Sequence, residues 1–329
     1  MKRITALFIL VILAMSSCRP ANYTSGVQET ESLKIGVLVY SGNDPYVMSV
    51  RDNIKTLSIA YPNAEVIYYD AKSDQGLQFE QVDELIKSGV DCLAINLVDI
   101  GSFKRMAEKL LEADMPAVFF NREPDLVLMK SYKNLFFVGT NVNEAGILQG
   151  EMIVDVWENS DVDKNGDGIL QYILLKGEID HVDSIARSSM ALQHLRDANI
   201  EVEELLSHAC NWDKQAARDL MLENSALLEK AEAIISNNDS MAIGTLEAME
   251  GLNLPVIPIF GVDAIQEAVA LIHEGKIAGT VKQDSMAMAK NVLKMCVNGG
   301  TNLEFLHDID INPDESGVAI RIPYQSYTK

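Results

Sequence analysis

The chain has 329 residues, 48 of them acidic and 27 basic, and its formal net charge at pH 7 is −21. This balance argues against a nucleic-acid partner, which requires basic patches, while a solvated acidic surface serves solubility and does not by itself indicate a cationic ligand. The length predicts more than one hydrophobic core and therefore two lobes.

The N-terminus has the pattern of a bacterial export signal. Two basic residues precede an apolar run from Ile4 to Met15, which is shorter than the roughly twenty residues that span a bilayer. Ser-Ser-Cys18 follows and resembles a lipoprotein processing site, with ordinary cleavage and an incidental cysteine as the alternative. We expect a signal peptide over 1–17, a lipid-anchored tether over 18–32, and a periplasmic or cell-surface protein held to a membrane through Cys18.

From residue 33 onward, short β-branched segments alternate with longer amphipathic segments. The expected strands are Lys34–Tyr40, Glu65–Asp70, Cys92–Asn96, Ala117–Asn121, Leu135–Gly139, Gln171–Lys176, Glu201–Ser207, Ala233–Ser236, Val256–Val262, Ile277–Val281 and Ile320–Tyr324. The expected helices include Val47–Ala60, Gln78–Ser88, Ser102–Ala113, Glu144–Glu158, Ser184–Ala198, Met241–Glu250 and Ala264–Glu274. This alternation predicts an α/β fold, and so many strands favour two doubly wound parallel sheets in two lobes over one open sheet.

Several expected strands end in an amide or a carboxylate: Asp70, Asn96, Asn121, Asn238 and Asp263. Ligands of doubly wound folds bind outside the carboxyl ends of the strands. Each residue alone could instead cap a helix or start a turn. Together they predict a polar cleft without an obvious nucleophile.

Three parts of the chain supply groups that suit a neutral sugar, which presents hydroxyls at its edge and C–H bonds on its faces. Hydrogen bonds to charged partners are worth roughly 1.5–3 kcal/mol each, so carboxylates and arginine are favoured, with aromatic rings for the faces. They occur in Tyr40–Tyr46, in Lys176–Arg187, and in a third set at strand ends. The third set comprises Asn211–Asp213, Ser236–Asp239 and Phe260–Asp263. A surface salt bridge with a helix cap is the alternative for Lys176–Arg187, and core packing is the alternative for Trp212.

These segments resemble the galactose/glucose-binding proteins of bacterial sugar ABC transport, a group of type I periplasmic binding proteins. The matching stretches are Ala94–Asp99, Val118–Pro124, Leu174–Glu178, Asn237–Ala242, Phe260–Ala264 and Ala278–Val281. They follow the family's order from about Lys34 to Tyr324. The resemblance implies a three-segment hinge, with crossings near Asn121, Lys282 and Arg321. It also implies an N-terminal lobe of 33–121 plus 283–318 and a C-terminal lobe of 122–282 plus 319–329.

The resemblance also implies a ligand set. Tyr46 and Trp212 would stack on the two faces of the sugar, one from each lobe. The polar contacts would come from Asp44, Asn96, His181, Asp183, Arg187, Asn238 and Asp263, with Tyr40 lining the pocket. Two positions depart from the family: Gln283 replaces an asparagine, and Tyr46 replaces a phenylalanine and so adds a hydroxyl that needs a partner.

A loop that begins at Asp163 has the spacing of a calcium site. Oxygen ligands at positions 1, 3, 5, 7 and 9 would be Asp163, Asn165, Asp167, the carbonyl of Ile169, and Gln171, and Gly168 at position 6 permits a tight turn. Leu174 occupies the position of the EF-hand glutamate, so the loop is not an EF-hand. By resemblance to the related sugar-binding proteins, Glu232 would supply the missing carboxylate of a structural Ca²⁺ site. An Asp- and Gly-rich surface turn is the alternative.

We therefore expect a monomeric binding protein that captures a hexose, D-glucose or D-galactose, and delivers it to the permease of an ABC transporter. A chemoreceptor is a further partner implied by the resemblance. The first alternative is the same scaffold with a pentose or a sugar derivative as ligand. A carbohydrate-active enzyme is more distant, because nothing resembles a nucleophile elbow, a phosphate loop or a zinc-protease motif. A sugar-responsive repressor would need an N-terminal DNA-binding domain where this chain has an export signal.

Overall fold

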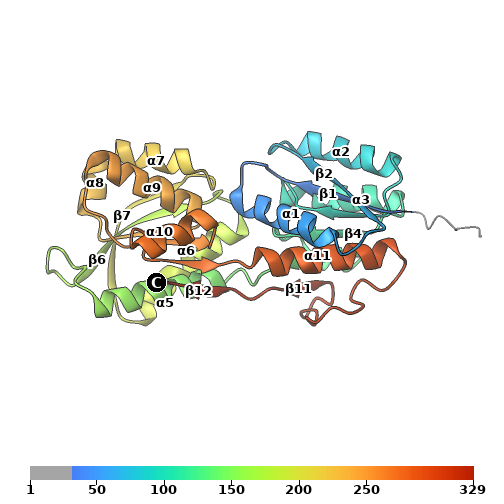
Figure 1. Ribbon diagram of the computed structural model, residues 1–329. Coiled ribbons are helices and arrows are strands. Elements are labelled where there is room, and N and C mark those ends of the chain that lie inside the picture. Colours follow the sequence, from blue (N-terminus) through green and yellow to red (C-terminus); the bar gives the residue numbers. More distant parts are fainter. Residues whose placement is uncertain (1–31) are drawn as a thin grey trace, which may run out of the picture. The chain divides into compact units, whose positions relative to one another are not determined.

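The structure is a computed structural model, and it describes residues 32–329. The expected signal peptide, Cys18 and the tether up to residue 31 lie outside the described residues. Within 32–329 the chain forms two six-stranded sheets, each with helices on its two faces (Figure 1). The predicted α/β fold with two doubly wound lobes is confirmed. Across this same range, no helix combines the length and the apolar character needed to cross a bilayer.

The first sheet is wholly parallel. In spatial order it contains β11 (Ala319–Arg321), β5 (Leu135–Gly139), β4 (Ala117–Phe120), β3 (Cys92–Ile95), β1 (Leu33–Val39) and β2 (Ala64–Asp70). Helices α1 (Pro45–Ser58) and α11 (Ser285–Gly300) pack on one face. Helices α2 (Gln75–Lys87) and α3 (Phe103–Glu112) pack on the other, together with the short helix α4 (Leu126–Met129), and η1 (Ile100–Ser102) leads into α3.

The second sheet is parallel except at one edge. In spatial order it contains β12 (Gln325–Tyr327), β10 (Gly279–Lys282), β9 (Ile259–Asp263), β8 (Ala233–Ser236), β6 (Ile169–Lys176) and β7 (Glu201–Ala209), and β12 is antiparallel to β10. Helices α5 (Glu144–Asn159) and α6 (Val182–Asp197) cover one face. The other face is covered by α7 (Lys214–Glu223), α8 (Ser225–Lys230), α9 (Asp239–Leu252) and α10 (Gln266–Glu274).

Local sequence explains why these elements form. The central strands β3, β4 and β8 are buried along their whole length, as expected where helices cover both faces of a parallel sheet. Polar residues at the carboxyl ends of strands then start the next helices. The Asp44 carboxylate accepts the N–H of Val47 to cap α1, and the Asn238 side chain accepts the N–H of Met241 to cap α9. Strand ends and helix starts therefore gather at one edge of each sheet.

The predicted boundary between the lobes at residues 121 and 122 is wrong. Strand β5 pairs with β4 and β11, and Phe137 is packed in the first lobe's core, so 122–139 and 319–321 belong to the first lobe. The chain crosses between β5 and α5, between β10 and α11, and between β11 and β12. The last two crossings lie near Lys282 and Arg321, as expected. The hinge therefore has three segments, but the first crossing comes about one strand later than predicted.

Candidate functional site

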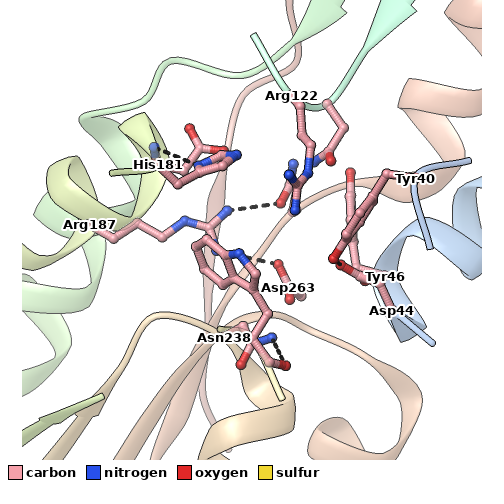
Figure 2. Close-up of a pocket in the computed structure, with 12 residues that line it drawn as sticks. Tyr40, Asp44, Tyr46, Arg122, His181, Arg187, Asn238 and Asp263 are labelled. Atoms are coloured by element: carbon pink, nitrogen blue, oxygen red, sulfur yellow. Dashed lines mark hydrogen bonds and ion pairs between the residues drawn. The ribbon is translucent and has the colours of Figure 1, made fainter. Parts of the chain in front are cut away.

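A small cavity lies between the carboxyl ends of the two sheets (Figure 2). The lining residues come from both lobes and from the hinge: Tyr40, Asp44, Tyr46, Asn121, Arg122, His181, Asp183, Arg187, Trp212, Asn238, Asp263 and Gln283. Ten of the eleven predicted ligand-binding residues are thus brought to one cavity.

The first lobe contributes a carboxylate flanked by aromatic rings. The Tyr40 hydroxyl donates a hydrogen bond of 2.8 Å to one oxygen of Asp44, and the other oxygen accepts the N–H of Val47 at 3.0 Å. Tyr46 is buried on the first turn of α1, and its hydroxyl donates to the sulfur of Met288 at 3.5 Å. The hydroxyl that distinguishes Tyr46 from phenylalanine therefore has a partner inside the first lobe.

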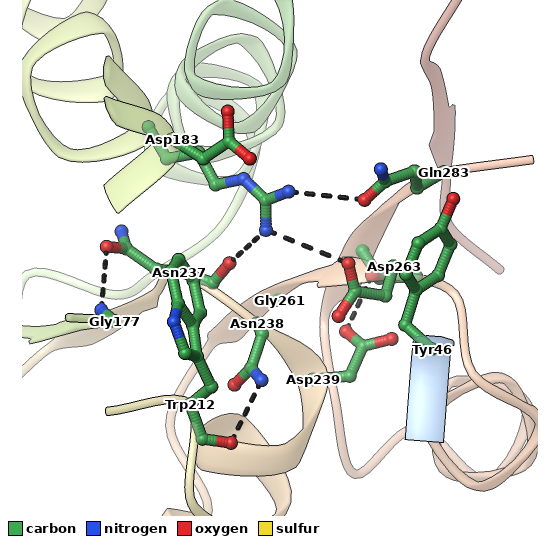
Figure 3. A network of polar contacts seen from close by, with 12 residues as sticks. Tyr46, Gly177, Asp183, Trp212, Asn237, Asn238, Asp239, Gly261, Asp263 and Gln283 are labelled. Carbon is green, nitrogen blue, oxygen red and sulfur yellow. Dashed lines mark hydrogen bonds and ion pairs between the residues drawn. The ribbon is translucent and has the colours of Figure 1, made fainter. Parts of the chain in front are cut away.

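Arg187, on α6, contacts several residues of a polar network, among them Asn237, Asp263 and Gln283, which Figure 3 labels. Its guanidinium donates to the carbonyl of Asn237 at 2.7 Å, to Oε1 of Gln283 at 3.2 Å and to the hydroxyl of Tyr324 at 3.1 Å. A carboxylate oxygen of Asp263 lies 3.7 Å away. Arg187 Nε and Gln283 Nε2 are buried and have no hydrogen-bond partner among the described residues. The network thus leaves two donors free beside the cavity.

His181 caps α6 and forms an edge-to-face pair with Trp212, with ring centroids 5.5 Å apart. Its Nδ1 accepts the N–H of Asp183 at 3.2 Å, which assigns the proton of the neutral ring to Nε2. That Nε2 is buried without a partner, and burial lowers the pKa of His181. His181 therefore contributes to the lining of the cavity an N–H donor without a protein partner in the described range. Gly177 supports Trp212, because a Cβ at this glycine would lie 2.1 Å from the indole.

Two further predicted residues sit at strand ends of the second sheet. Asp263 ends β9 with φ of 117°, an unfavourable conformation for a residue with a side chain. Burial raises the pKa of its carboxyl, although Arg187 opposes the shift. Asn238 donates from its amide to the carbonyl of Trp212 at 3.1 Å while its oxygen caps α9. Asn238 therefore positions the indole as well as lining the cavity.

The structure places Asn96 behind the cavity wall. Its side-chain oxygen accepts the N–H of Tyr40, and its amide donates to the carbonyl of Phe120 and the side chain of Asn121, so it ties three strand ends together. In its place Asn121 and Arg122 line the cavity. Asn121 was recognisable as a polar residue at a strand end, whereas nothing local to the sequence distinguished Arg122 from a surface arginine.

The loop that starts at Asp163 folds around that side chain. The Asp163 carboxylate accepts the N–H groups of Gly166 at 2.7 Å and of Gly168 at 2.9 Å. Glu232 is 1 % exposed and accepts the N–H groups of Lys164 at 2.5 Å and of Gln171 at 3.1 Å. Sequence-distant Glu232 is thus brought against the loop. Within residues 32–329, however, no three His, Cys, Asp or Glu side chains are grouped closely enough to hold a metal ion.

Comparison with known proteins identifies the family. A family model described as a periplasmic binding protein domain matches residues 35–299. The D-galactose/methyl-galactoside binding periplasmic protein MglB of Haemophilus influenzae is 37 % identical over 268 residues, which cover 80 % of this chain and 81 % of that protein. The chain belongs to the periplasmic binding protein family. Such proteins act outside the cytoplasm as the solute-binding components of transporters.

Two further binding proteins are similar to much of this chain. A putative rhizopine-binding protein of Rhizobium meliloti is 26 % identical over 78 % of this chain and 77 % of its own. The solved structure of an ABC transporter solute-binding protein from Bacillus halodurans with bound myo-inositol matches with a TM-score of 0.76 at 24 % identity, covering 92 % of this chain and 96 % of that chain. This structural likeness shows the shared fold.

The chemistry of the cavity is that of hydrogen-bonding recognition. Asp44, Asp183 and Asp263 offer acceptors, while Arg187, His181 and Gln283 offer donors. Among the described residues that line the cavity there is no serine, threonine, cysteine or lysine. Aromatic rings of Tyr46 and Trp212 come from opposite lobes. A small polar molecule with apolar faces would be held on its edge by charged groups and on its faces by rings.

Proposed function

We propose that this periplasmic binding protein holds a hexose, D-glucose or D-galactose, in the interlobe cavity and delivers it to an ABC transporter. The observation that carries the proposal is that three buried polar atoms without partners, Arg187 Nε, His181 Nε2 and Gln283 Nε2, belong to residues lining one cavity. A buried donor without a partner costs roughly 1–3 kcal/mol, so each favours a ligand that supplies an acceptor. The hydroxyls of a neutral sugar supply acceptors and also donate to the carboxylates of the same cavity.

Two features of the cavity lining favour a pyranose over an acyclic or anionic ligand. Tyr46 and Trp212 provide an aromatic ring from each lobe, which suits the two C–H faces of a ring. The carboxylates of Asp44, Asp183 and Asp263 outnumber the two arginines, so an anion would meet net repulsion. The relative from Haemophilus influenzae, which is 37 % identical, is described as a galactose-binding protein, so D-galactose is the first ligand to test.

Isothermal titration calorimetry tests the assignment. We expect D-glucose or D-galactose to bind at least tenfold more tightly than ribose, xylose or myo-inositol. Binding of a pentose without binding of either hexose would replace the hexose assignment with the alternative ligand class. In parallel, NMR of the sugar after prolonged incubation should show it unchanged; any turnover would favour the carbohydrate-active enzyme instead.

The mature protein would be anchored to a membrane and would dock on membrane partners. Cys18 would carry the lipid that anchors the mature chain, and the closed, sugar-loaded monomer would dock on the transporter's permease and on a chemoreceptor. The basis for the anchor is the sequence around Cys18, and the basis for the two partners is the family. Because only the closed form contacts a sugar with both lobes, sugar binding would select the surface that these partners recognise.

The loop from Asp163 is proposed to hold a structural Ca²⁺ ion. Its donor set consists of oxygens, from Asp163, Asn165, Asp167, the carbonyl of Ile169, Gln171 and Glu232, which is the chemistry that Ca²⁺ prefers. One observation supports the fit: Glu232, distant in sequence, is buried against the loop. The ion would bind these oxygens and brace the start of β6.

A further inference from the structure

Arg122 joins the two lobes beside the cavity. It follows β4 in the first lobe, its side chain is 5 % exposed, and it lines the cavity without belonging to the predicted ligand set. One guanidinium nitrogen donates to the carbonyl of Val98 at 2.9 Å. The guanidinium carbon lies 3.7 Å from the ring centroid of Tyr40, whose hydroxyl in turn bonds Asp44. Two contacts within the first lobe, with Val98 and Tyr40, therefore orient Arg122.

The partner of Arg122 lies in the second lobe. Glu178 follows β6, and its carboxylate receives hydrogen bonds of 2.5 Å and 3.4 Å from the two terminal nitrogens of Arg122. The Glu178 side chain is 41 % exposed, at the edge of a second hollow between the lobes that is also lined by Val98 and Asp180. A fork-to-carboxylate pair of this kind fixes distance and orientation together.

We propose that Arg122 and Glu178 form an interlobe latch that sets ligand affinity by stabilising the closed form. The latch spans the two lobes and requires them to meet, whereas the contacts of Arg122 with Val98 and Tyr40 lie within the first lobe. Apparent affinity scales with the population of the binding-competent form, so loss of the latch weakens binding without removing any contact to the ligand. Because the lobes must separate before the ligand leaves, the effect falls on the release rate. This inference rests on the proposed sugar-binding function.

The test compares Glu178→Gln with Asp180→Asn. Each removes one carboxylate charge from the same hollow, but Asp180 forms no ion pair with the described residues. In stopped-flow measurements on the purified protein, following tryptophan fluorescence with the bound hexose, we expect the Glu178→Gln release rate to rise about tenfold and the association rate to change less than twofold. Asp180→Asn should match the wild type within twofold. Glu178→Asp, whose shorter side chain cannot keep both hydrogen bonds, should fall between them.

The salt dependence of sugar binding distinguishes an electrostatic role of the Arg122–Glu178 pair from a purely structural role. Raising NaCl from 0.05 M to 0.5 M should weaken sugar binding more in the wild type than in Glu178→Gln. Small-angle X-ray scattering without sugar should show a larger radius of gyration for Glu178→Gln than for Asp180→Asn. Equal release rates in the two variants, in a protein that binds hexose, would overturn the latch and leave the proposed function standing. Absence of hexose binding to the wild type would instead overturn the proposed function.

Discussion

Arg187 illustrates how one buried side chain serves the site and the hinge together. Burial alone would lower the pKa of its guanidinium, but Tyr324, Asp263 and Asp183 raise that pKa above its ordinary value, so the group stays charged. Gln283 and Tyr324, which accept its hydrogen bonds, lie at two of the hinge crossings, and Thr140 at the third crossing donates to the Tyr324 hydroxyl at 3.1 Å. A ligand that contacts Arg187 is therefore connected to all three hinge segments.

Trp212 is the residue whose removal should most directly test the stacking arrangement. Trp212→Ala should weaken hexose binding at least tenfold in calorimetry, about 1.4 kcal/mol, because the ring provides one apolar face of the cavity. Trp157→Ala is the matched control: this other tryptophan, on α5, packs against the second lobe's core and does not line the cavity. Similar dissociation constants for Trp212→Ala and the wild type would contradict the stacking role.

Asp239 is a buried carboxylate next to the cavity, and its burial disfavours the charged form. It is fully buried at the start of α9, where it accepts the hydroxyl of Thr280 at 2.6 Å and the N–H of Ile265 at 2.9 Å. Burial raises its pKa to about 7, and these hydrogen bonds oppose the shift. Asp239 holds the loop that carries Asp263, so it positions a cavity carboxylate.

The raised pKa of Asp239 has a defined consequence for stability. Between about pH 4 and pH 7 the folded protein retains a proton that the unfolded chain releases, so the free energy of unfolding falls as pH rises through this window and levels off above it. We expect Asp239→Asn to flatten this decline by roughly 2–3 kcal/mol between pH 5 and pH 7.5 in urea-unfolding experiments. Parallel pH profiles of the two proteins would refute this assignment.

At the scale of elements, the pair α5 and α6 sets the position of the site in the second lobe. Gly146 and Gly150 on α5 allow close approach: a Cβ at Gly146 would lie 2.6 Å from the backbone oxygen of Arg187, and one at Gly150 would lie 2.6 Å from Cβ of His194. Helix α6 carries Asp183 and Arg187. The spacing between these two helices therefore determines how far the guanidinium reaches into the cavity.

Gly146→Ala tests this dependence. The added methyl group must push α6 outward, so we expect a loss of about 1–3 kcal/mol in the free energy of unfolding together with weaker hexose binding. Gly251→Ala, near the end of α9, meets no atom within 4 Å and should stabilise the protein slightly or leave it unchanged, with sugar affinity retained. If Gly146→Ala were as stable as the wild type and bound sugar as tightly, the close packing would not control the site.

Helix caps and site residues proved to be the same residues in several elements. Asp44, His181 and Asn238 each cap a helix and also line the cavity. This follows from topology, because in a doubly wound sheet the start of a helix lies directly after the carboxyl end of a strand. One side chain can then satisfy a helix N–H and leave a second polar atom, or a second oxygen, for the cavity.

At the scale of the molecule, the loop from Asp163 and the sugar cavity lie at opposite ends of β6, since the loop precedes this strand and His181 follows it. Removal of calcium by a chelator should therefore lower the melting temperature by several degrees while leaving hexose affinity within about threefold. Asp163→Asn should mimic chelation and make the protein insensitive to it. An unchanged melting temperature of the wild type on chelation would contradict an occupied site.

The sequence by itself determined the strand–helix alternation, the two-lobed class and the polar strand ends Asn121, Asn238 and Asp263, while the other predicted cavity residues came from the family resemblance. Period-two and helical patterns are local, and polar residues at carboxyl ends of parallel strands must converge wherever the sheet forms. Strand β12 and the short helices α4 and α8 were not predicted, because short segments carry weak periodicity.

Only the tertiary structure decided which sheet receives β5, because its buried apolar sequence fits between any two parallel strands and pairing is a long-range choice. The tertiary structure also decided that the Asn96 side chain forms hydrogen bonds with neighbouring strand ends and that Arg122 pairs with Glu178 of the other lobe. Those roles depend on which groups from distant segments lie within hydrogen-bonding distance, and residue type and local spacing do not contain that information.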